Sequence, residues 1–354
     1  MFQSFLHRNR TERVLPLLLC LCLLTAPAAA AAPNVPAGRP EVLVPSGQTL
    51  GVRLSAGCLV VVSLSPVQTA AAVLHPAEEA GLAAGDRITH AGERAVASIA
   101  DLQALLKSSA GQPLTLRVIR GGQPLTLTLT PARSASDGLY KIGAWLRDSM
   151  AGIGTMTFYD PATGLFGALG HGICETQSDE LLPLGTGSAV PADITGVRRG
   201  GSGKPGELLG ELGADPGGTL YANTEHGVFG HVTGDTLRPG GEPVELAPPG
   251  QVTPGPATIL SCVDGGEVRP YAVEIQRVYP NAAGPRGFML KVTDAALIER
   301  TGGIVQGMSG SPVLQNGRLV GAVTHVLVSD PLRGYGIFIS RMLDTALARL
   351  DAAA

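Results

Sequence analysis

The chain has 354 residues, which is long enough for two domains, and its formal net charge of −3 argues against a basic surface for nucleic acid. Aromatic residues make up only 4% of the sequence, whereas 48 glycines and 27 prolines are present. This composition favours many short strands joined by turns over a helical bundle, so we expect a mostly β protein.

The N-terminus has the pattern of an export signal. Three arginines precede an apolar stretch, residues 14–24, and an alanine-rich segment follows it. The apolar stretch is short for a membrane-spanning helix. We therefore predict export across the membrane, with residues 1–32 as a signal peptide or N-terminal anchor and residues 33–44 as a linker. The pattern leaves open whether this segment is cleaved or stays associated with the membrane.

The next part of the chain mixes strands with helices. The pattern predicts an apolar strand at 58–64, a helical turn that ends at Gly81, a helix at 99–106 and two strands at 114–119 and 125–129. We expect these elements to form a small α+β domain.

This order, with Ala80-Gly81-Leu82 followed by Gly85-Asp86-Arg87-Ile88, resembles a bacterial PDZ domain over residues 45–131. The resemblance implies that an extended peptide or a chain terminus binds as an added strand at a sheet edge. Leu50-Gly51-Val52 matches the carboxylate-binding loop of PDZ domains. The alternative is that Gly51 only begins a strand.

Residues 139–354 predict a second domain of short strands with two chemically notable turns. His171 lies between two glycines at the end of the strand predicted at 166–169, and Ser309 lies in the turn Gly307-Met308-Ser309-Gly310-Ser311-Pro312. A serine hydroxyl is a poor nucleophile unless a base takes its proton and hydrogen-bond donors receive the oxyanion. His171 can be that base, and the glycine-rich turn can leave N–H groups free as donors.

The surroundings of Ser309 strengthen this interpretation. An apolar strand, the hairpin turn Asn316-Gly317, a return strand and a Gly-x-Gly strand entry follow it. The layout, with His before Ser on an all-β chain, is similar to the nucleophile region of chymotrypsin-like barrels. A helix with Leu343, Ala346, Leu347 and Leu350 on one face ends the chain.

One glycine-rich segment has no assigned chemistry. Residues 196–218 contain Arg198, Arg199 and Lys204. We interpret this segment as a mobile hairpin loop, and nothing in its sequence supports a contact with substrate.

From about residue 40 to its end, the chain resembles the SpoIVB-type sporulation serine peptidases. The resemblance depends on Gly154-Thr155-Met156-Thr157-Phe158-Tyr159-Asp160-Pro161, on Gly167-Ala168-Leu169-Gly170-His171, and on residues 301–312 around the serine. It implies a PDZ domain followed by a chymotrypsin-like double β-barrel with a C-terminal helix. It also implies that His171 and Ser309 are catalytic and that the N–H groups of Gly307 and Ser309 form the oxyanion hole, with Ser311 ranked below Ser309.

The acid that orients the histidine is the least constrained part of the site. The resemblance places it at Asp294, which can equally be read as a turn residue at a strand end. Other candidates stay open, and they are Asp264, Asp235, Asp193 and Asp179.

The resemblance also implies a biological role. The protein would be an exported serine endopeptidase, secreted from the forespore into the intermembrane space. It would cleave itself near the N-terminus and then cleave a membrane-tethered regulator of a site-2-type protease during endospore formation. No cofactor or metal is implied.

Three alternatives remain at this stage. The chain could be a non-catalytic PDZ scaffold. It could be a metal-dependent hydrolase that uses His171, His226 and His231, although the spacing of the last two places their rings on opposite faces of a strand. It could also be a cysteine enzyme that uses Cys174, three residues after His171.

Overall fold

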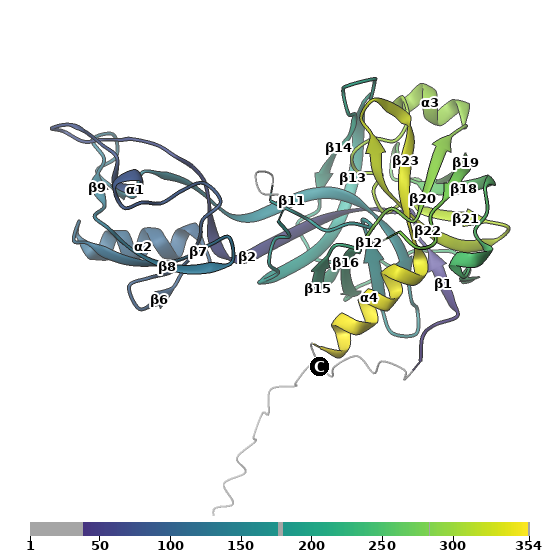
Figure 1. Ribbon diagram of the computed structural model, residues 1–354, viewed down its shortest axis with the longest axis horizontal. Helices are drawn as coiled ribbons and strands as arrows, with labels where there is room; N and C mark the ends of the chain where they lie inside the picture. Colours follow the sequence, from purple (N-terminus) through teal and green to yellow (C-terminus); the bar gives the residue numbers. More distant parts are fainter. Residues whose placement is uncertain (1–37, 176–179, 283, 353–354) are drawn as a thin grey trace, which may run out of the picture. The chain divides into compact units, whose positions relative to one another are not determined.

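The computed structural model describes residues 38–175, 180–282 and 284–352 (Figure 1). The predicted signal or anchor segment lies outside these residues. Within them, no helix is both long enough and apolar enough to cross a membrane.

Strands are the main regular secondary structure of the described chain, as the composition predicts. The first twelve are β1 (Val42–Pro45), β2 (Thr49–Leu64), β3 (Val67–Gln68), β4 (Val73–Leu74), β5 (Arg87–Ala91), β6 (Arg94–Ala95), β7 (Leu114–Arg120), β8 (Gln123–Leu129), β9 (Ala132–Arg133), β10 (Tyr140–Lys141), β11 (Ala144–Tyr159) and β12 (Leu165–Ala168). The remaining strands are β13 (Thr186–Arg198), β14 (Glu207–Leu212), β15 (Gly218–Thr224), β16 (Gly227–Val232), β17 (Val244–Glu245), β18 (Gly255–Ser261), β19 (Arg269–Val278), β20 (Phe288–Val292), β21 (Pro312–Gln315), β22 (Arg318–Leu327) and β23 (Asp330–Phe338). The helices are α1 (Pro76–Glu79), α2 (Ile99–Ser109), α3 (Ala295–Thr301), α4 (Ile339–Asp351) and the 3₁₀ helix η1 (Pro249–Gln251).

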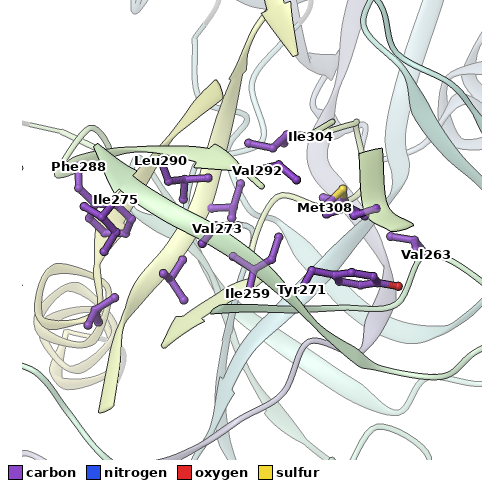
Figure 2. Close-up of a cluster of buried hydrophobic side chains, with 14 of the residues drawn as sticks. Ile259, Val263, Tyr271, Val273, Ile275, Phe288, Leu290, Val292, Ile304 and Met308 are labelled. Carbon is purple, nitrogen blue, oxygen red and sulfur yellow. The ribbon is translucent and has the colours of Figure 1, made fainter. Parts of the chain in front are cut away.

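Residues 255–338 contain a closed barrel with the strand order β18-β19-β20-β23-β22-β21. Alternate residues of β20, Phe288, Leu290 and Val292, point into it and are fully buried. Figure 2 shows this core, into which Ile304 and Met308 also project from the turn that holds Ser309. Each such side chain contributes about 1.5–3 kcal/mol by leaving water, so the barrel core anchors the segment that leads into Ser309.

A second ring of strands lies earlier in the chain. The order β11-β12-β16-β15-β13-β2 closes on itself through the pairing of β2 with β11. Helix α4 covers part of this region, because Met342, Leu343 and Ala346 are buried in a cluster with Phe158 and Phe229. Two six-stranded rings and a C-terminal helix confirm the predicted chymotrypsin-like architecture.

The predicted PDZ domain is also confirmed. Helix α2 begins at a capping box in which Ser98 and Asp101 satisfy each other's backbone N–H groups. The Arg120 guanidinium binds the fully buried Asp86 carboxylate with two hydrogen bonds of 2.7 and 2.8 Å. Because a buried charge is stable only when paired, this bidentate contact lets Asp86 sit inside the domain.

Leu50-Gly51-Val52 does not form the predicted carboxylate-binding loop. These residues lie inside β2, a continuous strand of 16 residues that pairs with β11 on one side and β13 on the other. A side chain on Gly51 would collide with Leu212 and Val190, at 2.5 and 2.7 Å, so the glycine permits close packing within the barrel. A double-paired strand leaves no row of free N–H groups for a chain terminus.

Candidate active site

His171 follows β12 after a sharp turn in which Leu169 and Gly170 both have φ of 69°. Its Nδ1 lies 2.8 Å from the carbonyl oxygen of Gly172. Because a carbonyl can only accept, Nδ1 carries the proton, and Nε2 of the neutral ring keeps a free lone pair. Burial lowers the pKa of His171, so the ring is neutral at pH 7. This is the tautomer that a general base needs.

Asn223 on β15 holds the loop that follows His171. Its Oδ1 accepts the Ile173 N–H at 2.9 Å, while its Nδ2 donates to the carbonyls of Ile173 and Leu182 at 2.8 and 2.9 Å. The side chain uses three of its four hydrogen-bonding positions on this loop. Sequence reasoning did not identify Asn223, because its partners lie about 40–50 residues away in the chain.

Ser309 lies in the turn before β21. Its hydroxyl donates to the Thr324 carbonyl at 2.8 Å and is not hydrogen-bonded to His171. Both residues nevertheless line one cavity of about 530 Å³, which we call the Ser309 cavity. Catalytic hydrogen bonds often form only with substrate present, so this arrangement is compatible with a serine that turns toward His171 during reaction.

The backbone around Ser309 offers donors for an oxyanion. Within the described residues, neither the Gly307 N–H nor the Ser309 N–H is engaged in a hydrogen bond. Gly307, Ser309 and His171 all line the Ser309 cavity. The structure therefore brings together the predicted base, nucleophile and oxyanion donors.

Two buried threonines of β11 hold this turn. Thr155 donates its hydroxyl to the Gly307 carbonyl at 2.8 Å and its N–H to the Ser309 carbonyl at 2.9 Å. Thr157 donates its hydroxyl to the Gly310 carbonyl at 2.8 Å. Neither was singled out from the sequence. Threonines two positions apart in an otherwise apolar buried strand were the available signal, because a buried hydroxyl needs a partner.

The structure does not bring the predicted acid to His171. Asp294 is the N-cap of α3, where Oδ1 accepts the Leu297 N–H at 3.0 Å and Oδ2 accepts the Ala272 N–H at 3.3 Å. An aspartate immediately before an Ala-Ala-Leu-Ile run favours such a cap. Within the described residues, no hydrogen bond joins His171 to a carboxylate.

None of the other candidate acids that the structure describes lines the Ser309 cavity. Asp264 pairs with Arg300 at 3.1 Å and Asp235 with Arg238 at 3.5 Å, both on the surface. Asp193 is exposed on β13. Asp179 lies outside the described residues.

The alternative chemistries can be compared with the same geometry. His226 Nδ1 is hydrogen-bonded to the Thr345 hydroxyl at 2.8 Å, and His231 packs against the Tyr221 ring. Neither histidine lines the Ser309 cavity beside His171. No group of three or more candidate metal ligands is present among the described residues. Cys174 does line the Ser309 cavity. Ser311 is buried, and its hydroxyl donates a hydrogen bond to the Ser261 hydroxyl.

The Ser309 cavity is mainly aliphatic. Its walls include Met150, Ile153, Ile304, Val305 and Val326, and none of its described lining residues is Asp, Glu, Lys or Arg. Such a surface favours an apolar side chain, because apolar area removed from water is the main source of affinity there.

His325 forms one more part of the cavity wall. Its ring centroid lies 5.0 Å from that of His171. Burial lowers the pKa of His325 to about 4, with a smaller effect from the nearby His171 and Arg286. The ring is therefore neutral at pH 7 and adds no charge beside His171.

Comparisons with known proteins agree with this description. Residues 138–343, more than half of the chain, match the family model described as SpoIVB peptidase S55, and residues 75–120 match a PDZ-domain model. The search of curated proteins returned no match.

Two similar solved structures are crystal structures of the Rv3671c protease from M. tuberculosis, one of its active form and one of its inactive form. The active form is 14% identical, covers 57% of this chain and 74% of its own, and gives a TM-score of 0.33. The inactive form is 15% identical, covers 56% of this chain and 84% of its own, and gives a TM-score of 0.31.

Proposed function

Because the chain belongs to the SpoIVB peptidase S55 family and is a serine peptidase, we propose that Ser309 is its nucleophile and His171 its general base. One observation carries the assignment. A neutral histidine with a free Nε2 lone pair, a serine and two residues with unused backbone N–H groups all line one cavity. No other described serine with a neighbouring histidine lines that cavity.

The proposed reaction is acyl transfer. As the Ser309 Oγ attacks the peptide carbonyl, its proton passes to His171 Nε2, and the oxyanion is held by the N–H groups of Gly307 and Ser309. His171 then gives that proton to the leaving amine. In the second half, His171 takes a proton from the water that attacks the acyl-enzyme, and it returns this proton to the Ser309 Oγ as the acyl–oxygen bond breaks and the acid product leaves.

The Gly172 carbonyl performs part of the work that a triad acid usually does. It accepts the Nδ1–H and so fixes the tautomer and the ring orientation. Because it carries no formal charge, it stabilises the imidazolium less than a carboxylate would. We therefore propose a serine–histidine pair oriented by a backbone carbonyl.

The aliphatic walls of the Ser309 cavity support a preference for an apolar residue beside the scissile bond. The wider role is proposed from family membership. The protein would be exported, would cleave itself near its N-terminus, and would cleave a membrane-tethered regulator of a site-2-type protease during endospore formation, while its PDZ domain binds a peptide or chain terminus. The export pattern of residues 1–32 agrees with this setting.

The test is labelling with a serine-directed phosphonate together with peptide cleavage. Wild type should be labelled at Ser309, and Ser309→Ala and His171→Ala should each lower kcat by at least about 10⁴-fold while the fold persists. Cys174→Ala, a change on the same cavity wall, is the matched control and should retain activity. Loss of activity in Cys174→Ala with retention in Ser309→Ala would overturn the assignment.

A further inference from the structure

The β13–β14 hairpin, for which the sequence indicated no role, starts in the ring of strands β11-β12-β16-β15-β13-β2 and reaches the closed barrel of β18 to β23. Its turn, residues 199–206, contacts two segments there. Gly200 N–H donates to the Thr301 carbonyl at 2.8 Å, at the end of α3. Gly203 N–H donates to the Val328 carbonyl at 2.9 Å, and Ser202 donates its hydroxyl to the Ser329 carbonyl at 3.0 Å.

The start of β14 also pairs with the chain just before Ser309. Glu207 and Gln306 form a parallel β-bridge. Gln306 N–H donates to the Gly206 carbonyl at 2.9 Å, and Leu208 N–H donates to the Gln306 carbonyl at 2.8 Å. Gln306 is thus held on both its N–H and its C=O by the hairpin.

This pairing sets the direction of one oxyanion donor. The carbonyl of Gln306 and the N–H of Gly307 belong to the same planar trans peptide group and point in opposite directions. When Leu208 binds the carbonyl, the Gly307 N–H must point away from β14. Gly307 lines the Ser309 cavity, which is where an oxyanion would form.

The other donor is fixed within the turn itself. The Met308 carbonyl, which shares a peptide group with the Ser309 N–H, accepts the Ser311 N–H at 3.0 Å. The two donors therefore have different supports. Ser309 depends on its own turn, whereas Gly307 depends on a hairpin about 100 residues earlier in the chain.

We propose that the β13–β14 hairpin is a positioning element for the oxyanion hole, with Gly206 and Leu208 holding the 306–307 peptide so that Gly307 N–H faces the reacting carbonyl. The proposal rests on the assignment of Ser309 as nucleophile. When the hairpin is displaced, the 306–307 peptide is free to rotate and the oxyanion loses one donor. Removal of one such donor lowers kcat by about 10²–10³-fold.

Gly206 is the position where the hairpin can be displaced by one methyl group. A Cβ there would lie 2.4 Å from Gly200 N and 2.7 Å from Val305 Cγ1, closer than such atoms can approach. Gly206→Ala should lower kcat by about 10- to 100-fold and leave KM within about twofold. Gly201→Ala is the matched control, because it is the same change in the same turn with nothing within 4 Å, and it should behave as wild type.

A transition-state analogue distinguishes positioning from a general loss of structure. A peptide aldehyde forms a hemiacetal with Ser309 whose oxygen occupies the oxyanion hole, so its inhibition constant should rise in Gly206→Ala in proportion to the loss of kcat/KM. An unchanged inhibition constant would overturn the proposal. A KM that rises by the same factor as the inhibition constant would also overturn it.

A second variant covers the case in which Gly206→Ala does not fold. Arg199 donates to the Ile298 carbonyl at 3.0 Å, and both Arg199 and Ser202 are exposed. The double variant Arg199→Ala/Ser202→Ala therefore removes two side-chain contacts of the turn and leaves the core intact. It should lower kcat by about 3- to 10-fold with the same rise in the aldehyde inhibition constant. Wild-type behaviour of this double variant would count against the proposal. Phosphonate labelling of Ser309 in wild type separates that outcome from a failure of the proposed function.

Discussion

The two sides of the Ser309 cavity are held in different ways. His171 is fixed by its own loop, through the Gly172 carbonyl, and that loop is fixed by Asn223 of the same barrel. The Ser309 turn is fixed by three separate parts of the chain, namely β11, β14 and β22.

Because their supports differ, the two sides should respond differently to substitution. The loop after the proposed base depends on one side chain, Asn223, for three hydrogen bonds beside its own backbone hydrogen bonds, so the loss of Asn223 loosens this loop. The nucleophile turn has many partners, and each one fixes a different peptide group. We expect single changes on the His171 side to have large effects, and changes around Ser309 to have smaller effects that depend on which peptide group is released.

Asn223→Ala should produce the largest effect of the variants considered in this comparison. It removes three hydrogen bonds from the loop after His171 and leaves the Ile173 N–H and the Leu182 carbonyl without their partners, whereas the Ile173 carbonyl keeps the Leu182 N–H at 3.0 Å. Each unpaired buried group costs about 1–3 kcal/mol, and a small displacement of the base can lower the rate by about 100-fold. We expect kcat to fall by about that factor, measured with a peptide substrate alongside thermal unfolding.

Asn223→Asp tests specifically whether the two hydrogen bonds that Asn223 donates are needed. The carboxylate can still accept the Ile173 N–H, but it cannot donate to the two carbonyls and would face them with a negative charge. It should therefore be at least as damaging as Asn223→Ala. Wild-type kcat in either variant would contradict the view that His171 depends on this one side chain.

Thr155→Val tests the Ser309 side, with Thr157→Val as its matched control. Both changes replace a buried hydroxyl by a methyl group of similar size, and each leaves one carbonyl unpaired at a cost of about 1–3 kcal/mol of stability. Thr155 donates to the Gly307 carbonyl, which lies in the chain between the Gly307 N–H and the Ser309 N–H. Thr157 donates to the Gly310 carbonyl, which follows both of these donors in the chain. We expect similar losses of stability, but a fall in kcat of about tenfold only for Thr155→Val. Equal falls in kcat would mean that the turn responds as one rigid unit.

The sequence was informative where chemistry and local structure lie in one short stretch. The positions of His171 after β12, and of Ser309 before β21 with its Asn316-Gly317 hairpin, were predictable because each proposed catalytic residue is contiguous with its strand. The paired strands and the C-terminal helix were predictable from apolar periodicity.

The remaining features depend on partners that are distant in the chain. Gly51 has the local pattern of a binding loop, but pairing with both β11 and β13 makes it part of a strand. In the sequence, Leu208 has the pattern of an ordinary apolar strand residue. Only the hydrogen bond from its N–H to the Gln306 carbonyl connects it to the Ser309 turn. Propensity and periodicity describe local preferences and carry no information on such contacts.

The pH dependence tests how His171 is held. Burial lowers the pKa of His171, and no described carboxylate raises it. Because the neutral ring is the base, activity should be full above the lowered pKa and should be lost as pH falls through it. The acid limb of kcat/KM should therefore lie below about pH 6.5, the ordinary value for histidine. His325, with a pKa lowered to about 4, adds no second ionisation near neutral pH. An acid limb above pH 7 would indicate that a carboxylate pairs with His171 in the working enzyme.

The smallest effect should come from Asp294→Asn, which separates a helix cap from a catalytic acid. Asparagine caps helices about as well as aspartate, so the α3 cap should remain and stability should change little. If Asp294 only caps α3, the kcat/KM of Asp294→Asn should stay within about twofold of wild type, and the acid limb of its pH profile should not move. Asp294→Ala should lose about 1 kcal/mol of stability and show the same kinetics.

If Asp294 moved to His171 in the working enzyme, Asp294→Asn would instead lower kcat by about 10⁴-fold, because the amide would favour the wrong tautomer of the base. The two outcomes differ by several orders of magnitude, so a single pH–rate profile of this variant decides whether the base is oriented by a carbonyl or by a carboxylate.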